Sequence, residues 1–219
     1  MRKRTVDPLD ELMAALAVLT GRPATADDRR SFQQYLHLFL RWNQVHRMTA
    51  LDSARDIVHG LFLDSLLLFA LLPPRPLKVA DIGAGAGIPG LPIRLADPNL
   101  ALMLVESRRK RVSFLRTMCR ELKLADVIVK EARAEELIRE EPALRDAFDV
   151  VVTRAVGPVV GLLPVALGYL RPGGLFIAGG SPHPSAGAPL EVVRVTIPGT
   201  RSARTFLRAR KGSNVPRGT

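Results

Sequence analysis

An acidic residue stands beside a glycine-rich loop in the first half of the chain. Asp81 lies near the end of a short apolar run, and glycines follow at Gly83, Gly85 and Gly87. Glycine accepts positive φ angles and, because it lacks a Cβ, lets a ligand lie directly against the backbone. A helix that begins after such a loop presents free N–H groups and a positive dipole end to the ligand. This arrangement predicts a nucleotide-binding loop.

The spacing of the glycines indicates which nucleotide would bind. A dinucleotide-binding loop has the pattern G-x-G-x-x-G, and Ile88 stands where the third glycine would be. A P-loop is excluded, because no Gly-Lys-Ser/Thr follows. The Asp81 carboxylate would repel a pyrophosphate but suits a ligand with an ammonium and a sulfonium group, which favours S-adenosylmethionine. The alternative is that this Gly- and Ala-rich turn merely packs a helix tightly against a strand.

Three further segments fall at the ends of predicted strands, where ligands bind in doubly wound sheets. Glu106 ends the second strand, and its carboxylate can accept hydrogen bonds from both ribose hydroxyls. Ala134-Glu135 follows the third strand, at the height of an adenine ring. Arg154 follows the fourth strand, at the mouth of the pocket. Each segment alone is equally compatible with a solvated surface, but their joint placement at successive strand ends predicts one site.

Alternating strands and helices position these residues. From residue 78 onward the alternation predicts a mostly parallel sheet with helices on both faces. The last two strands lack a helix between them, which predicts an antiparallel edge hairpin. Strands are expected near residues 78–82, 101–105, 126–130, 148–153, 174–178, 192–197 and 204–210, and helices near 88–96, 107–123, 133–139 and 158–170. The segment from Leu170 to Gly174 is predicted to be a tight turn into the fifth strand, and the linker 181–189 to be a loop.

The first 75 residues show a different pattern, with three helical segments that carry capping residues and apolar faces. These helices are expected to begin at Asp7-Pro8, Thr25 and Ser53 and to run to about residues 19, 43 and 72. We therefore expect a helical extension over residues 1–75, packed on a Rossmann-like α/β domain over residues 76–219 that ends in a basic tail.

Charge indicates the class of partner. The chain has 219 residues and a formal net charge of +11, and no acidic residue follows Glu191. Concentrated positive charge favours nucleic acid through phosphate neutralisation and counterion release. The alternative is a solvated tail in an arginine-rich protein. The C-terminal cations are Arg194, Arg201, Arg204, Arg208, Arg210, Lys211 and Arg217, and a second basic stripe on a predicted helix consists of Arg109, Arg116, Arg120 and Lys123.

Other classes of protein are disfavoured. Cys119 is the single cysteine, so an internal disulfide is excluded, and its place on an apolar helix face predicts a core thiol. No Cys/His cluster has metal-ligand spacing, so we expect no metal site. The longest apolar run, Leu66 to Leu72, is too short to span a bilayer, and no signal-peptide pattern is present. We expect a cytoplasmic monomer.

The chain resembles the bacterial small-subunit ribosomal RNA methyltransferase G family, also called glucose-inhibited division protein B. The resemblance covers nearly the whole chain in order, and its most specific parts are the glycine loop through Ile88-Pro89-Gly90 and the E-S-x-x-K-R-x-x-F-L segment. The segments that carry it are Arg41-Trp42-Asn43, Leu63-Asp64-Ser65, Asp81 to Gly90, Glu106 to Leu115, and Thr153-Arg154-Ala155.

This resemblance implies an S-adenosylmethionine-dependent methyltransferase of class I fold that methylates N7 of a guanine in 16S ribosomal RNA near the decoding centre. It implies cofactor contacts at Gly83, Ile88, Ala134-Glu135 and Arg154. The chain departs from the family pattern in its substrate half: Gly60-Leu61 replaces a basic residue and a His, Gly179 replaces a Lys, and Arg47 stands at a common Asn position.

Methylation of guanine N7 requires no general base, because N7 has a lone pair and carries no proton. We therefore expect Arg154 to position cofactor or RNA rather than to transfer a proton, with proximity and orientation as the main sources of rate. The alternatives are a methyltransferase for another RNA or a small molecule, a nicotinamide oxidoreductase, and a non-catalytic RNA-binding protein with a vestigial cofactor pocket.

Overall fold

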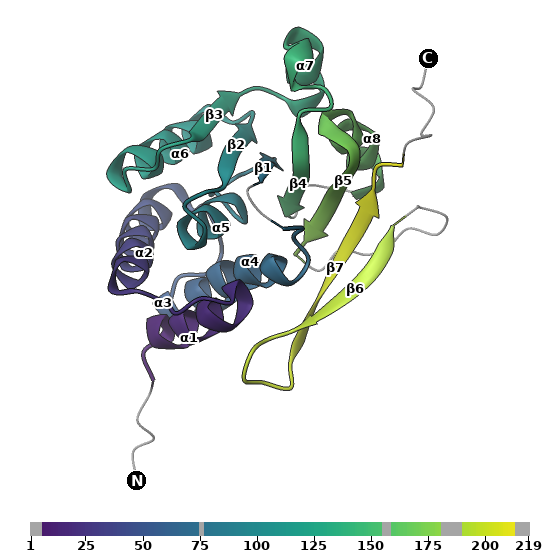
Figure 1. Cartoon of the computed structure of the whole chain (residues 1–219). Coiled ribbons are helices and arrows are strands. Elements are labelled where there is room, and N and C mark those ends of the chain that lie inside the picture. The colour runs from purple at the N-terminus through teal and green to yellow at the C-terminus, as the bar shows by residue number, and fades with distance from the viewer. Residues whose placement is uncertain (1–5, 75–76, 155–158, 181–189, 213–219) are drawn as a thin grey trace.

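A mostly parallel sheet runs through the centre of the molecule, with strands in the order β3-β2-β1-β4-β5-β7-β6 (Figure 1). The structure is a computed structural model that describes residues 6–74, 77–154, 159–180 and 190–212. Its strands are β1 (Lys78–Ile82), β2 (Ala101–Glu106), β3 (Val127–Glu131), β4 (Phe148–Arg154), β5 (Leu170–Gly179), β6 (Glu191–Thr196) and β7 (Ala203–Arg210). The first five strands pair in parallel, and β7 is antiparallel to both β5 and β6. The predicted mostly parallel α/β sheet with an antiparallel edge hairpin is confirmed.

Helices cover both faces of this sheet. The α-helices are α1 (Pro8–Thr20), α2 (Ala26–His46), α3 (Ala54–Ile57), α4 (Asp64–Leu66), α5 (Gly90–Ala96), α6 (Arg109–Glu121), α7 (Ala134–Glu140) and α8 (Val159–Tyr169), and the other helical turns are η1 (Val58–Leu63), η2 (Leu67–Ala70) and η3 (Pro142–Leu144). None of the helices in the described ranges is long and apolar enough to cross a membrane.

Alternation along the buried strands divides the core into two layers, because successive side chains point to opposite faces. On β1, Val79 packs with the N-terminal helices, α5 and α6, whereas Ala80 packs with α7 and α8. On β4, Val152 belongs to the first layer and Val151 to the second. The N-terminal helices therefore share one core with the sheet. The domain boundary predicted between residues 75 and 76 lies outside the described residues, as do the 181–189 linker and Arg217.

The caps predicted for the first two helices are present. The Asp7 carboxylate accepts a hydrogen bond from Leu9 N at 2.9 Å, and Pro8 is the first residue of α1. Thr25 and Asp28 form a complete capping box at the start of α2. This helix ends at His46, with Arg47 as its C-cap, rather than near residue 43.

The third predicted helix is not continuous, and that expectation was wrong. From Ser53 the chain forms α3, the π-helical turn η1, α4 and the 3-10 turn η2 in succession. Residues 61–69 are all buried, so side chains on every side of the segment have to fit the core. The Ser65 hydroxyl also bonds the Leu61 carbonyl oxygen at 2.6 Å. Packing around the whole circumference thus overrides the α-helical period.

The segment predicted as a tight turn before the fifth strand is instead part of β5. Phe148 pairs with Leu170 and Val150 pairs with Leu175, so β5 carries extra residues that bulge from the ladder. The bulge is held by the end of β7, since Gly173 N donates to Lys211 O at 2.8 Å. A distant strand therefore supplies the partners that keep this segment extended.

Arg47 closes α2 in the left-handed region, at φ 47°. We expect Arg47→Asn to raise the free energy of unfolding by less than about 1 kcal/mol, because this conformation costs a residue with a Cβ roughly 1–2 kcal/mol and Asn tolerates it better. Urea denaturation measures the change. The control Arg41→Asn, on the exposed side of α2, should lower stability through helix propensity. A less stable Arg47→Asn protein would contradict the expectation.

Candidate functional site

The glycine loop joins β1 to α5 and is anchored on the end of β2. Gly83 N and Ala84 N both donate to Val105 O, at 2.9 and 3.0 Å. Gly83 and Gly85 have φ angles of 73° and 56°, so both occupy the region that favours glycine. The loop thereby turns its backbone toward the carboxyl ends of the strands.

Gly87 has a different role from the other two glycines. Its φ angle is 78°, and a Cβ built there would lie 2.4 Å from Leu91 Cδ1. The helix α5 therefore packs against this glycine, as the packing alternative to ligand binding predicts. Ile88 is likewise buried in the core, at 6% exposure. Gly87 and Ile88 therefore pack the loop against the core and do not line the hollow described below.

Glu106 links the glycine loop to the start of α6. Its Oε2 accepts a hydrogen bond from Gly85 N at 2.9 Å, and its Oε1 accepts one from Arg108 N at 2.8 Å. Arg111 Nη1 lies 3.7 Å from Oε2, and the Glu106 side chain is only 5% exposed. An ionised carboxylate offers about four lone-pair sites, so it retains acceptor capacity for a ligand.

A hollow of about 310 Å³ opens beside this carboxylate. It lies beyond the carboxyl ends of β1, β2 and β3, and its walls combine apolar side chains with a polar rim. The lining residues are Ile82, Gly83, Val105, Glu106, Ser107, Arg108, Arg111, Ala132, Arg133, Ala134, Glu135 and Leu162. The structure thus brings together four of the predicted site residues, namely Gly83, Glu106, Ala134 and Glu135. This size is at the lower end for a small-molecule site.

Asp81 does not line that hollow. Its side chain is fully buried on the α5 side of β1, where Oδ2 accepts a hydrogen bond from Gly90 N at 2.8 Å. Among the described residues Oδ1 has no hydrogen-bond partner. Burial raises the pKa of Asp81 to about 7. Its predicted attraction for a cationic ligand stays a prediction. Any such attraction would be electrostatic and would act at a distance, without contact between the carboxylate and the ligand.

Arg154 ends β4 but points toward the N-terminal helices. Its Nη2 donates to Gly60 O at 2.7 Å, and both terminal nitrogens lie 3.3 Å from Asp64 Oδ2. Thr153 beside it donates to Ile82 O at 2.8 Å, which ties β4 to the end of β1. Sequence reasoning did not identify Asp64 as a functional residue, although it belongs to the Leu63-Asp64-Ser65 segment.

The rim of the hollow is strongly cationic. Arg108, Arg109 and Lys110 open α6, are exposed, and have no ion-pair partner in the described part of the chain. Arg133 adds a fourth exposed cation across the hollow. Positive side chains at a helix N-terminus oppose the helix dipole, so the local arrangement favours a bound polyanion.

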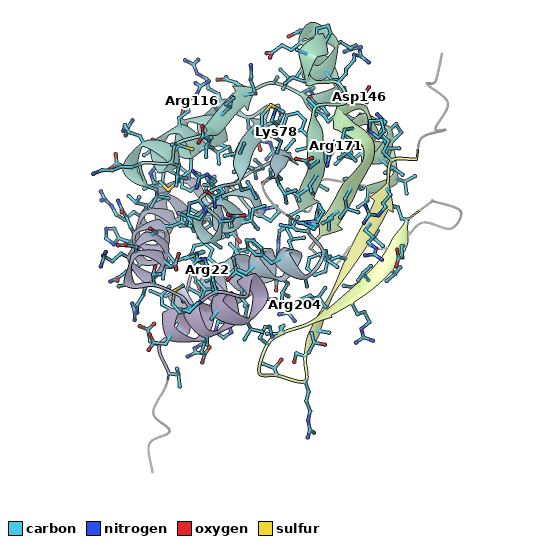
Figure 2. All side chains as sticks on the ribbon, viewed as in Figure 1. Arg22, Lys78, Arg116, Asp146, Arg171 and Arg204 are labelled. Carbon is cyan, nitrogen blue, oxygen red and sulfur yellow. The ribbon has the colours of Figure 1, made fainter. Side chains whose placement is uncertain are left out.

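The C-terminal cations are less available than the sequence predicts. Several of them pair with carboxylates of the same chain: Arg204 with Asp64, Arg208 with Glu191 and Lys211 with Asp146. Arg194 and Arg201 remain exposed and make no ion pair within the described ranges. In the predicted helical stripe, Arg116 lies 3.7 Å from Glu131. Acidic partners distant in sequence thus neutralise part of the basic hairpin; Figure 2 labels Arg204 where this hairpin approaches the N-terminal helices.

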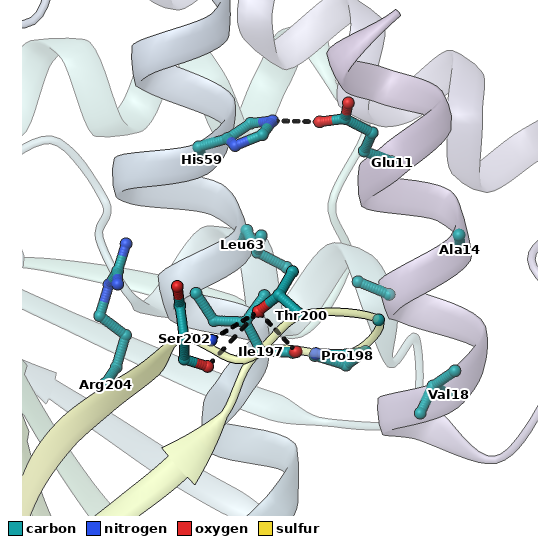
Figure 3. A pocket seen from close by; sticks show the side chains of 12 residues that line it. Glu11, Ala14, Val18, His59, Leu63, Ile197, Pro198, Thr200, Ser202 and Arg204 are labelled. Carbon is teal, nitrogen blue, oxygen red and sulfur yellow. Dashed lines mark hydrogen bonds and ion pairs between the residues drawn. The ribbon is translucent and has the colours of Figure 1, made fainter. Parts of the chain in front are cut away.

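A second hollow of about 600 Å³ lies between α1, η1 and the β6–β7 turn (Figure 3). His59 Nε2 and Glu11 Oε2 approach to 2.5 Å at one side, and Arg204 stands at another. Its remaining walls are largely apolar, with Val18, Leu63 and Pro198 among them. In the described residues no group of three or more His, Cys, Asp or Glu side chains could hold a metal ion.

Cys119 is half-buried against the core, and burial raises the pKa of its thiol to about 11. A thiol with so high a pKa is almost entirely protonated at neutral pH and is a poor nucleophile. This environment agrees with the predicted core thiol.

Comparison with known proteins identifies relatives over most of the chain. The family model described as "rRNA small subunit methyltransferase G" (GidB) matches residues 28–184. The Ribosomal RNA small subunit methyltransferase G of Desulfitobacterium hafniense (strain Y51) is 38% identical over 154 residues, which are 70% of this chain and 63% of that protein. That of Xanthomonas euvesicatoria pv. vesicatoria (strain 85-10) is 36% identical over 187 residues, 82% of this chain and 85% of that protein.

Solved structures support the fold. A predicted O-methyltransferase from Agrobacterium tumefaciens has a TM-score of 0.57 at 21% identity and covers 70% of this chain and 81% of its own. A SAM-dependent methyltransferase from Aquifex aeolicus has a TM-score of 0.56 at 13% identity, with coverage of 75% and 97%. The predicted class I methyltransferase fold is confirmed.

Proposed function

Because the chain belongs to the rRNA small subunit methyltransferase G family, we propose that it transfers a methyl group from S-adenosylmethionine to N7 of a guanine in 16S ribosomal RNA. The observation that carries this proposal is the hollow at three successive strand ends, where Gly83, Glu106 and Ala134 meet. Ligands of doubly wound sheets bind at this edge, beside the point where strand order reverses.

The residues of the hollow fit the adenosine part of this methyl donor. Glu106 would accept the ribose hydroxyls while it keeps its two backbone hydrogen bonds. Ile82, Val105 and Leu162 provide apolar walls for a purine ring, beside Ala134 and Glu135. Gly83 and Gly85 would leave room for the rest of the molecule against the backbone, and Gly87 and Ile88 would hold the loop in that shape. The bound sulfonium supplies the methyl group.

The acceptor chemistry requires little of the protein. Guanine N7 attacks with its own lone pair, so no side chain has to remove a proton. The chain then contributes by binding both reactants in line and by excluding water from the sulfonium. Arg154 would act as a positioning group at the mouth of the site.

The basic rim supports RNA as the substrate class. Arg108 and Arg133 line the hollow, and Arg109 and Lys110 follow Arg108 at the start of α6; all four are exposed and available to phosphate groups. The proposed partner is ribosomal RNA, either free or in the small ribosomal subunit, and the protein would act there as a monomer in the cytoplasm.

Methyl-group mapping tests the proposal. The protein is incubated with labelled S-adenosylmethionine and either unmodified 16S RNA or 30S particles, and the modified base is identified by mass spectrometry. We expect label at N7 of one guanine. Label in another RNA would redirect the proposal to a different acceptor, and salt-sensitive RNA binding without any label would favour a non-catalytic protein.

Arg154→Ala should lower methyl transfer by about 100-fold, the order of loss that follows from misplaced reactants. The fold should persist, because Asp64 keeps its contact with Arg204 at 2.8 Å. Single-turnover kinetics measures the rate of methyl transfer, and thermal denaturation shows whether the fold persists. Arg194→Ala serves as control, since Arg194 is an exposed arginine of β6 on the far edge of the sheet. Unchanged turnover in Arg154→Ala would reject the positioning role.

A further inference from the structure

We propose that Asp64 is a positioning residue for methyl transfer and that it acts by holding the Arg154 guanidinium. This inference rests on the proposed function, since it concerns how that reaction is organised. Asp64 lies in α4 of the N-terminal helical region, 90 residues from Arg154 in the chain. It would therefore connect the helical extension to the site at the strand ends.

The contacts of Asp64 are specific and largely shielded from water. Its side chain is 10% exposed and contacts arginines from two different strands. Oδ2 lies 3.3 Å from both terminal nitrogens of Arg154, and Oδ1 accepts a hydrogen bond from Nε of Arg204 at 2.8 Å. Both carboxylate oxygens are therefore occupied by guanidinium groups.

The sequence of β4 directs Arg154 toward this carboxylate. Val150, Val152 and Arg154 alternate onto the face that packs against the N-terminal helices, and the first two are buried there. At the end of the strand the same direction brings Arg154 to Gly60 and Asp64. The Gly60 carbonyl belongs to the π-helical turn η1 and accepts from Arg154 Nη2 at 2.7 Å. Turns of this kind often occur at functional sites.

The backbone of Arg154 lies beside the glycine loop at the end of β1. Asp81 of β1 pairs with Val152, so Arg154, two residues further on, ends beside Gly83 of the loop. On its other side Arg154 pairs with Gly179 of β5. A long arginine side chain at this place has many rotamers, and a fixed carboxylate partner restricts them. Asp64 would thus limit where the cation can lie relative to the bound reactants.

Arg204 and Arg154 share the Asp64 carboxylate. Its side chain is 41% exposed, against 19% for Arg154, and it lines the 600 Å³ hollow. With Arg204 removed, Asp64 still has Arg154 as a partner, whereas with Asp64 changed Arg154 loses its only anionic contact within the described residues. The effect of Arg204→Gln on methyl transfer should therefore be smaller than that of Asp64→Asn.

A double-mutant cycle tests the inference. We expect Asp64→Asn to lower kcat for methyl transfer by about 10- to 100-fold, as a misplaced group does. We expect the same change to have no further effect in an Arg154→Ala background, because a residue that acts through Arg154 has nothing left to position. The loss in Asp64→Asn should also be divided between KM and kcat in the same proportion as in Arg154→Ala. A merely structural role would instead give additive losses and a different split.

The controls separate this inference from the proposed function. Glu11→Gln removes another carboxylate of the same helical region, one that pairs with Arg55 and His59, and should leave kcat unchanged. If Asp64→Asn does not fold, Asp64→Asn/Arg154→Met is compared with Arg154→Met, and equal turnover is expected. Additive losses would overturn the role of Asp64 while leaving methyl transfer intact. Failure of the wild-type protein to methylate any RNA would overturn the proposed function itself.

Discussion

Asp81→Asn should make the free protein markedly more stable at pH 8 and weaken its affinity for S-adenosylmethionine. The wild-type carboxylate is fully buried, accepts one hydrogen bond from Gly90 N, and has a pKa raised to about 7 by burial. A shift of this size from the ordinary value of 3.8 corresponds to a cost of about 4 kcal/mol when the group is ionised. Asparagine keeps an oxygen for Gly90 N and carries no charge.

The pH dependence of this effect has a definite sign. The folded protein binds the Asp81 proton more tightly than the unfolded chain does, so the contribution of Asp81 to stability is complete below pH 3.8. It falls as the pH rises from about 4 to 7 and stays low above that range. The difference in free energy of unfolding between Asp81→Asn and wild type should therefore be small near pH 4 and largest at pH 8.

Urea denaturation at pH 4, 6 and 8 measures this difference, and calorimetric titration measures the cofactor affinity. Asp28→Asn is the matched control, because Asp28 is also buried but pairs with Arg22, which keeps the pKa of Asp28 below its ordinary value despite burial. Asp28→Asn should destabilise the protein at pH 8. Unchanged affinity in Asp81→Asn would mean that the carboxylate has no part in attracting a cationic ligand. Unchanged stability at pH 8 would contradict the cost of ionising this buried group.

Local patterns in the sequence were sufficient for most of the architecture. Asp7 and Thr25 mark helix starts through short-range capping bonds, and the apolar run before Gly83 marks a buried strand. These signals depend on residues close in sequence, which is why they translate directly into structure. Gly83, Glu106, Ala134 and Glu135 are far apart in the chain and meet at one hollow for a different reason: each follows or ends a predicted strand, and parallel strands end at a common edge.

The features that the sequence did not predict involve partners far apart in the chain. The segment from Leu170 to Gly174 is extended because it is bonded to the end of β7, and η1 departs from the α-helical period because residues around it are buried on every side. Arg154 faces Asp64 of the helical extension, and Arg204 reaches the same carboxylate from β7. Periodicity and composition contain no information on such contacts. The direction of a side chain at a strand end depends on which element packs above it.

Two of the residues that depart from the family pattern, Gly60 and Gly179, lie close to apolar side chains. A Cβ at Gly60 would lie 3.1 Å from Leu51 Cδ1, and a Cβ at Gly179 would lie 3.2 Å from Phe206 Cε1. Larger residues at either position would require these neighbours to move by a few tenths of an ångström. The positions that lack the usual basic residues are thus closely packed against apolar side chains in this chain.

Glu106→Ala should reduce the affinity for S-adenosylmethionine by about 100-fold, because each hydrogen bond to a charged group contributes about 1.5–3 kcal/mol and a tenfold change in affinity corresponds to about 1.4 kcal/mol. The change removes the proposed acceptor for the ribose hydroxyls. It also leaves Gly85 N and Arg108 N without their acceptor, so the glycine loop and the start of α6 lose their link. A less ordered loop lowers the fraction of protein that is competent to bind.

Calorimetric titration measures the cofactor affinity, and filter binding measures RNA affinity in the same samples. Glu131→Ala is the matched control, since Glu131 is the register partner of Glu106 on β3 but is not among the residues that line the hollow and is more exposed, at 37%. It should bind the cofactor as wild type does. RNA affinity should persist in Glu106→Ala, because the cations of the rim remain. Equal cofactor affinity in Glu106→Ala and wild type would mean that the hollow at the strand ends is not the cofactor site, whatever the family to which the chain belongs.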